Sequence, residues 1–526
     1  MAPTQLDIAK SWVTKQSPTT VLIGYGIAVY ILYLIYLVVY RLYFHPLAKF
    51  PGPKLNALTF WVETYYELFK GEGGQFPWAY AKWHQKYGPI VRITPDELHI
   101  QDSQYHEYFF HPSRPVDKPA AIANRFGNPL SAFASTKHAD HKMRRSALNP
   151  FFSKRKIAAF SPKIQNTMDK LVNKLIDEYA GTGRVVSLNK MWGCVSSDSI
   201  VGYAYERQYN FVDQPEFAAP LNQAMMDLLE PVHWVVQFPL LNTIMQSLPD
   251  WLLVKMEPKM ESVVKFNKEL TDQITSILSQ PKDTEKSTDN TIFRELLDSG
   301  LPSQELTLTR LHHESISIIG AGVESTMRTL VVCCFHVLEQ PQVRERLFKE
   351  LKEAVPDPSN MPGWDDLAKL PYLSACIEES LRLSYGTSQR MPRIYNGGPL
   401  PYPQQNPTHM IPAGTNVSMD IYPVSHDEVI FPSSFDFVPE RWLDDPKAPD
   451  GRKLSRYMVS FGKGTRSCTG MQLGYAELYI ALANFFLKLD GRVKLYKTTK
   501  RDVELARDRF APKMYKGCQG VRVVIE

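Results

Sequence analysis

The sequence predicts a mainly α-helical domain with a minor β portion, preceded by one transmembrane helix. Three observations support this: a long uncharged apolar segment near the N-terminus, apolar residues at helical spacing through most of the remaining chain, and only a few short strand-like runs. The chain has 526 residues, of which 44% are hydrophobic and 22% are charged. It can therefore form a large folded core, and extensive disorder is not expected.

Residues 21–40 form the predicted membrane anchor, after an N-terminal segment of residues 1–20. The span carries no charge, and its length at about 1.5 Å rise per residue matches the ~30 Å hydrocarbon layer of a bilayer. A cleaved signal peptide is the alternative, but the apolar run is long, starts late and lacks a following small-residue cleavage site. Slightly more basic residues follow the span than precede it, so the positive-inside rule favours a luminal N-terminus and a cytosolic body.

The segment 41–54 contains Pro46, Pro51 and Pro53, which cannot continue a helix. It is predicted to be a stiff hinge that lifts the body off the membrane. Residues 55–526 show no internal repeat and no strong domain break, so one large domain is expected.

Predicted helices are the segments in which apolar residues recur every three to four positions. They are Phe76–Tyr87, Ala139–Leu148, Ser161–Tyr179, Met256–Leu278, Glu305–Glu339, Val343–Val355, Leu373–Leu383 and Met471–Lys488. The predicted strands are Ile90–Ile93, Leu98–Ile100, Asn416–Asp420 and Val521–Ile525, and the polar stretch Gln280–Asn290 is a predicted loop.

The charge and the cysteines exclude several functional classes. The net charge of +5 suits an acidic partner or an anionic membrane, but no long Lys/Arg tract exists, so nucleic-acid binding is not expected. The six cysteines are scattered, and no pair has the C-x-x-C spacing of a zinc or redox site. A disulfide framework is not expected either, and the body is predicted to face a reducing compartment.

One cysteine, Cys468, lies in the segment FGKGTRSCTG, residues 461–470, directly before a predicted helix. Gly462 and Gly470 allow turns that side chains forbid and let the backbone approach a flat ligand closely. The helix N-terminus is expected to lower the thiol pKa. Arg466 supplies a permanent positive charge suited to a ligand carboxylate. A buried structural cysteine is the alternative for any lone thiol.

The pattern F-G-x-G-x-R-x-C-x-G, which begins at Phe461, resembles the haem-binding loop of the cytochrome P-450 family. The resemblance extends over residues 41–526 and implies the cytochrome P-450 fold, with 55–526 as a haem-thiolate catalytic domain. It also implies haem b as cofactor and Cys468 as the axial ligand of its iron. An axial thiolate favours O–O cleavage, so the implied activity inserts one oxygen atom from O2 into a hydrophobic small molecule, by hydroxylation or epoxidation.

Two further motifs carry the resemblance. Glu379 and Arg382 form an E-x-x-R pair on one helix face, which alone would suit a solvated surface ion pair. The family has this pair at this distance before the cysteine loop, followed by F-x-P-E-R, which here ends at Arg441. The resemblance implies a buried Glu379–Arg382–Arg441 network that holds the loop.

The resemblance also implies that Arg393, Arg145 and His141 contact the haem propionates together with Arg466. His141 and Arg145 are spaced for one helix face. Family members often carry Trp at the position of His141, and a basic face toward solvent or a reductase is the alternative interpretation of this segment.

The helix Glu305–Glu339 contains the sequence GAGVEST, residues 320–326, which is similar to the family's oxygen-activating pattern A-G-x-[DE]-T-[TS]. Small residues are expected to let the helix pass close over the haem, with a distorted turn that seats dioxygen and water. Glu324, Ser325 and Thr326 are the predicted catalytic residues, because an acid beside an alcohol can pass protons. Ser325 stands where the family has threonine, which puts the coupling of oxygen use to product in doubt.

The implied partners are O2, an NADPH-dependent reductase and the endoplasmic reticulum membrane, which the chain would span once. A basic patch is expected to steer the reductase, formed by Lys142, Arg144, Arg452, Lys453, Arg456 and Lys463. The segments RLYFHPLAKFPGPK, LPYLSACIEESLRLSYG and GVRVVIE look like fungal secondary-metabolism members of the trichodiene-oxygenase-like branch. That implies a terpenoid, polyketide or alkaloid substrate, bound near residues 120–133, 316–321 and 387–390. A haem-thiolate isomerase or dehydratase that needs no external electrons, and a haem sensor or carrier, remain alternatives.

Overall fold

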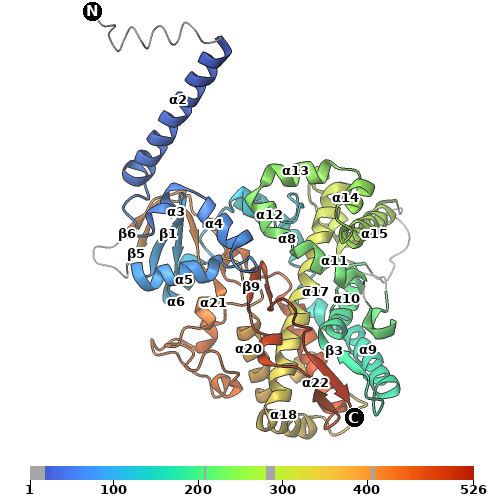
Figure 1. Ribbon diagram of the computed structural model, residues 1–526. Helices are drawn as coiled ribbons and strands as arrows, with labels where there is room; N and C mark the ends of the chain where they lie inside the picture. Colours follow the sequence, from blue (N-terminus) through green and yellow to red (C-terminus); the bar gives the residue numbers. More distant parts are fainter. Residues whose placement is uncertain (1–17, 206–208, 219, 280–290, 404–408) are drawn as a thin grey trace, which may run out of the picture.

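The computed structural model describes residues 18–205, 209–218, 220–279, 291–403 and 409–526. Figure 1 shows one helix near the N-terminus, α2, that projects out of a large body built mainly of helices. The predicted mainly α-helical class with a minor β portion is confirmed. The predicted loop at 280–290 and most of the predicted N-terminal segment lie outside the described residues.

Seven long helices form the core of the body. They are α9 (Lys154–Glu178), α10 (Leu188–Tyr205), α15 (Met260–Ser279), α17 (Leu308–Glu339), α18 (Pro341–Ala354), α20 (Pro371–Ser384) and α22 (Met471–Lys488). Shorter helices cover them: α3 (Lys54–Leu58), α4 (Trp61–Thr64), α5 (Phe76–Tyr87), α6 (Ser103–Phe109), α7 (Ala120–Ala123), α8 (His138–Leu148), α11 (Pro220–Leu229), α12 (Val232–Gln237), α13 (Pro239–Ser247), α14 (Asp250–Met256), α16 (Ile292–Leu297), α19 (Trp364–Leu367) and α21 (Ile421–Ser425).

The strands form small sheets at the edges of this helical core. The largest has the order β1-β2-β7-β4, with β1 (Ile90–Thr94), β2 (Glu97–Ile100), β7 (Asn416–Ser418) and β4 (Arg393–Ile394). A second has the order β3-β11-β8, with β3 (Val185–Ser187), β11 (Arg522–Ile525) and β8 (Val493–Leu495). The pairs β9 (Arg507–Arg509) with β10 (Ala511–Lys513) and β5 (Leu400–Tyr402) with β6 (His409–Ile411) complete the set.

The helices α5 and α22 have the predicted bounds, whereas α10 is absent from the prediction. Along α10, polar residues do not recur at the helical spacing that marks an exposed face, because the helix is buried on nearly all sides. A buried helix has no solvent-facing stripe, so its periodicity is lost. α9 also begins earlier than predicted and passes through Pro162.

The anchor and hinge differ from the prediction in two ways. α2 covers Pro18–Val39, and a π-helical turn continues it over Tyr40–Phe44, so the first residues of the predicted hinge are helical. The helix ends at His45, since the residue before a proline avoids helical dihedrals. The segment after it packs against the body. Its Leu47 and Phe50 are buried, and the Pro51 carbonyl accepts from the Arg92 N–H of β1 at 2.8 Å.

Candidate active site around Cys468

The loop that carries Cys468 is closed by its own backbone. The N–H of Cys468 donates to the carbonyl oxygen of Phe461 at 2.7 Å, and the N–H of Gly462 donates to that of Val459 at 2.7 Å. Gly462 has φ +65°, a left-handed conformation that favours glycine. A Cβ on Gly464 would lie 2.3 Å from the Phe110 carbonyl oxygen, so that position accepts no side chain. The glycines therefore fix where the cysteine sits.

The thiol of Cys468 is exposed, in contrast to the four cysteines that are fully buried in the core. Burial nevertheless raises its pKa, while hydrogen bonding from the Gly470 N–H and the charge of Arg145 lower it. A thiol that is accessible and yet desolvated faces a recess in the protein rather than bulk water. The prediction of a lowered pKa is wrong for the protein alone, because burial outweighs the helix N-terminus. Ligation to a metal ion would deprotonate the thiol outright.

Arg145 of α8 supports this loop directly. Its guanidinium donates to the carbonyl oxygen of Ser467, the residue before Cys468. Arg466 makes contacts of the same kind: its guanidinium donates to the carbonyls of Ser135 and Thr136 at 2.8 and 3.1 Å. Both arginines thus fasten the cysteine loop to neighbouring segments through backbone oxygens.

Buried positive charge collects beside the same loop. Burial and the charges of Arg393 and Arg466 hold the pKa of Lys118 well below its usual range. Burial, and to a smaller extent the charge of Arg466, lowers the pKa of Arg393 to about 9. Within the described residues, none of these three cations forms an ion pair with a carboxylate, and the Nε of Arg393 has no partner. Cations buried in this way fit a ligand with two anionic groups, as the propionates of haem would provide.

His141 of α8 faces the same positive charge. Burial, Arg466 and Lys118 lower its pKa to about 2, so the imidazole is neutral, and its Nδ1 has no hydrogen-bond partner. The sequence missed Lys118 and a second buried cation, Arg125. Both lie in the irregular stretch between α6 and α8, where no periodicity or motif marks a residue as buried.

The predicted structural network is present around a carboxylate with no exposure. Glu379 accepts from the Nε and Nη2 of Arg382 at 2.8 and 2.7 Å and from the Nε of Arg441 at 3.1 Å. The main-chain N–H of Val438 and the indole N–H of Trp442 also donate to it, each at 2.9 Å. Arg382 in turn reaches the carbonyls that precede the F-x-P-E-R segment. The network therefore joins α20 to the chain that leads into the cysteine loop.

The middle of α17 presents one accessible face. Ala321 and Ser325 are exposed on an otherwise largely buried helix, and their i, i+4 spacing puts them on the same side. The Ser325 hydroxyl donates to the Ala321 carbonyl at 2.8 Å. The predicted distorted turn is not found, because α17 is a continuous α-helix. Its glycines serve packing instead: a Cβ on Gly322 would lie 2.6 Å from the Ile200 side chain of α10.

The two neighbours of Ser325 point elsewhere. Glu324 is buried, and one carboxylate oxygen lies 3.4 Å from the Nζ of Lys513, from β10, while the other has no partner. Thr326 is buried and lies against Glu477 of α22, whose pKa burial raises to about 8. Of the predicted catalytic trio, only Ser325 is on the accessible face.

Comparison with known proteins decides the family. The sequence profile described as Cytochrome P450 matches residues 57–505. The chain belongs to the cytochrome P450 family. A cytochrome P450 monooxygenase of Eupenicillium brefeldianum, orf4, is 44% identical over 496 residues, which is 93% of this chain and 96% of that protein. Tryptophan 6-hydroxylase fscE of Fusarium equiseti is 35% identical, covering 96% of this chain and 97% of its own length. The TRI4 monooxygenase of Trichoderma arundinaceum is 32% identical, with 94% of each chain covered.

These matches confirm the cytochrome P450 fold, the haem-thiolate monooxygenase class and the resemblance to fungal members, the trichodiene-oxygenase-like branch included. Membership implies a haem cofactor and electrons from a redox partner. The donor set described above fits this P450's cofactor, since a recessed thiol lies next to buried cations that lack anionic partners.

Proposed function

We propose that this P450 is a membrane-bound monooxygenase that hydroxylates or epoxidises a hydrophobic small molecule of a fungal secondary-metabolite pathway. The observation that carries the proposal is the recessed thiol of Cys468, braced by the Gly470 N–H and Arg145. Haem bound there would supply oxygen activation, which a thiolate ligand favours. Arg393, Lys118 and His141 would hold its propionates.

The residues of α17 then handle protons. Ser325 lies on the accessible face and Glu324 is next to it in the chain, so the hydroxyl can hold a proton or water while the carboxylate exchanges protons with the Lys513 side. This acid–alcohol pair favours a monooxygenase over the isomerase or dehydratase alternative, which needs no proton delivery to oxygen. Thr326 is left out of this role, because it is buried against Glu477.

An aromatic cluster supports the proposed substrate class. Phe126 and Phe133, from the predicted pocket segment 120–133, contact each other at 6.0 Å between ring centroids. Phe510, from the turn between β9 and β10, lies 5.0 and 5.9 Å from them. Three half-buried rings suit a flat or bulky apolar molecule such as a terpenoid, polyketide or alkaloid. The predicted segment 387–390 contributes less, since Arg390 is buried in ion pairs.

Electrons are proposed to come from an NADPH-dependent reductase. The expected basic patch is largely neutralised, because Arg452 and Arg456 pair with Glu107, and Lys453 pairs with Asp445. Arg144 is turned inward and pairs with Glu305 at 2.8 Å. Lys142 is exposed, but one lysine does not make a basic patch. The proposal of a reductase therefore rests on the family rather than on a cationic surface.

Membrane attachment is proposed through α2, oriented with the catalytic body in the cytosol at the endoplasmic reticulum. The helix segment Pro18–Phe44 is long and apolar enough to cross a membrane, and its most apolar stretch is not buried against the body. The helix α17 is also long and apolar enough to cross a membrane, but it is mostly buried in the core of the body. Exposed apolar side chains on adjoining segments of the body support its attachment. They are Leu55, Phe60, Trp61, Tyr65, Phe69, Trp234, Leu240, Leu241 and Ile244.

The test uses microsomes that contain the full chain. Reduction and addition of carbon monoxide should give the thiolate-type Soret band, and NADPH with reductase should give oxygenated products from a terpenoid, polyketide and alkaloid library. Cys468→Ala should abolish the band, whereas Cys518→Ala, in a partly exposed cysteine away from the loop, should retain it. A wild-type protein without the band would refute haem-thiolate ligation. Product formation that needs no NADPH would select the isomerase or dehydratase alternative.

A further inference from the structure

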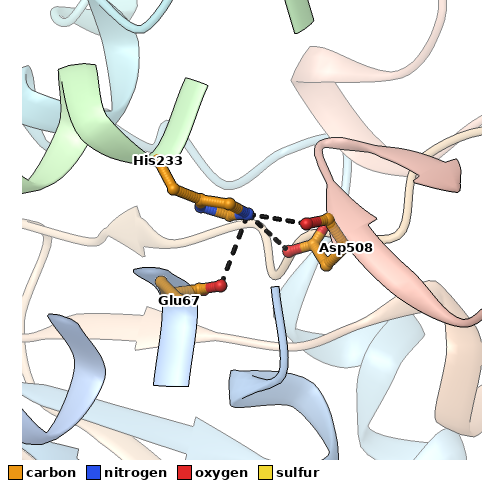
Figure 2. Close-up of side chains that lie close together, drawn as sticks. All are labelled: Glu67, His233 and Asp508. Atoms are coloured by element: carbon orange, nitrogen blue, oxygen red, sulfur yellow. Dashed lines mark hydrogen bonds and ion pairs between the residues drawn. The ribbon is translucent and has the colours of Figure 1, made fainter. Parts of the chain in front are cut away.

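Three buried side chains outside the haem region converge on one point. Figure 2 shows Glu67, His233 and Asp508 facing one another, from the π-helical turn Tyr65–Phe69, from α12 and from β9. The His233 Nε2 lies 3.3 Å from a carboxylate oxygen of Glu67 and 3.8 Å from one of Asp508. One ligand atom from each residue falls within 4.8 Å of the others. These separations are close to those between neighbouring ligands around a tetrahedral first-row cation.

Three of the four carboxylate oxygens in this cluster lack hydrogen-bond donors, and the fourth, Oδ1 of Asp508, accepts from Ser388 and the Phe510 N–H. Both carboxylate oxygens of Glu67 are buried without a hydrogen-bond partner, and so is the Oδ2 of Asp508. Each of these two residues is 1% exposed. Leaving a charged buried oxygen without a donor is strongly unfavourable, so such a group either binds a proton or is paired with a cation.

With every carboxyl group ionised, the surrounding charges do not balance. Five buried carboxylates, those of Glu63, Glu67, Glu97, Asp420 and Asp508, share this region with three buried guanidinium groups, those of Arg125, Arg390 and Arg509. Arg390 is committed to Glu63 and Glu97 at 2.7 and 2.8 Å and reaches Glu67 only at 3.8 Å. The negative excess is therefore concentrated at Glu67 and Asp508, next to an imidazole.

We propose that Glu67, His233 and Asp508 bind a divalent first-row cation of the Zn2+ class. One imidazole nitrogen and two carboxylate oxygens are ligands that Zn2+ accepts in proteins, and two negative charges neutralise it. The cation replaces the proton on Nε2, which otherwise donates to the Asp508 carbonyl at 2.8 Å. The ring proton then sits on Nδ1, 3.5 Å from the side-chain amide of Gln389. To accept that proton, the amide must turn its oxygen toward the ring and give up the hydrogen bond that it accepts from Arg125.

The cation would act as a structural clamp. It links α12 to the first helical turns of the body and to the β9–β10 hairpin, whose Phe510 and Lys513 border the proposed substrate and proton sites. Three segments far apart in the sequence are thus held at one point. The site is distinct from the haem loop, so loss of the cation should not remove the thiolate-type band.

The experiment measures metal in the full-length holoenzyme, purified with a tag that contains no histidine. Inductively coupled plasma mass spectrometry should find about one zinc per haem in the wild type. X-ray absorption at the zinc edge should show nitrogen and oxygen ligands at about 2.0–2.2 Å. His233→Gln and Asp508→Asn should each lower the zinc content at least tenfold while the haem band persists. A chelator should lower the thermal midpoint of the wild type, and added Zn2+ should restore it.

Glu230→Gln is the matched control, because that carboxylate is half exposed beside Arg507 and Arg509 but lies outside the cluster. It should retain full zinc content. A wild-type enzyme with less than a tenth of an equivalent of any divalent cation, and no thermal response to added Zn2+, would overturn the proposal. The carboxylates would then be balanced by protons alone. Equal zinc content in the wild type and both ligand variants would overturn it as well.

Discussion

Replacing Glu379 with glutamine tests the buried network that supports the cysteine loop. The Oε1 of Glu379 accepts from three donors: the Nη2 of Arg382, the Nε of Arg441 and the main-chain N–H of Val438. The Oε2 accepts from two, the Nε of Arg382 and the indole N–H of Trp442. An amide NH2 accepts no hydrogen bond, so at least two donors lose their acceptor whichever way the introduced amide turns. The fully buried Arg382 also loses its counter-charge.

An unpaired buried charge of this kind costs about 3–5 kcal/mol, which is roughly a thousandfold in the ratio of folded to unfolded protein. A body of this size gains roughly 1 kcal/mol/K of unfolding entropy, so the thermal midpoint should fall by about 4 °C. Burial raises the pKa of Glu379, but hydrogen bonding and charge from Arg382, then Arg441, outweigh it and leave the pKa below its usual value. The network's contribution is thus present at neutral pH and lost only as the pH falls through that lowered pKa.

The assay follows haem absorbance during heating of Glu379→Gln and of Glu440→Gln, at pH 6, 7 and 8. Glu440 is 46% exposed on a surface pair with Arg346, so its loss should cost less than about 1 kcal/mol. The difference between the wild type and Glu379→Gln should be the same at all three pH values. If Glu379→Gln melts together with Glu440→Gln, the network does not stabilise the loop and the reasoning fails.

Substitutions of Ser325 on α17, and of Lys513 and Glu477, which contact α17, give further tests. Ser325→Ala should raise peroxide release per product severalfold, while Ser325→Thr should not; equal coupling in both would remove the hydroxyl from the proposed role. Lys513→Met removes the cation 3.4 Å from Glu324 and should slow product formation severalfold at unchanged haem content, whereas Lys516→Met, on an exposed lysine nearby, should not. Glu477 has its pKa raised to about 8 by burial, so folding binds a proton and wild-type stability falls as the pH rises from about 4 through 8. Glu477→Gln should therefore gain up to about 1.4 kcal/mol per pH unit over the wild type between pH 6 and 7, and a pH-independent difference in thermal midpoint would contradict this.

Local patterns were sufficient where one segment carries the whole signal. The helices α5 and α22 have predicted bounds that agree with the structure. The cysteine loop was recognisable because its glycines, arginine and cysteine are fixed within ten residues. The Glu379–Arg382 pair was recognisable for the same reason, since residues three apart on a helix share a face.

Patterns failed where long-range packing decides. α10 is buried on nearly all sides and loses its periodicity. Gly320 and Gly322 suggested a distorted turn over the haem, whereas the structure uses Gly322 for close contact with Ile200. Whether a glycine bends a helix or admits a neighbour depends on what lies opposite, which one chain segment does not reveal.

The amino-acid order alone was enough to establish the helical class, the apolar N-terminal helix, the choice of Cys468 among six cysteines and the family to which its loop belongs. The direction of the Cys468 pKa, the pairing of Glu324 with Lys513, and the meeting of Glu67, His233 and Asp508 became visible only in three dimensions. The physical reason is that charge interactions and desolvation depend on distances through space. Those distances join residues hundreds of positions apart, while a sequence pattern reports only on its near neighbours.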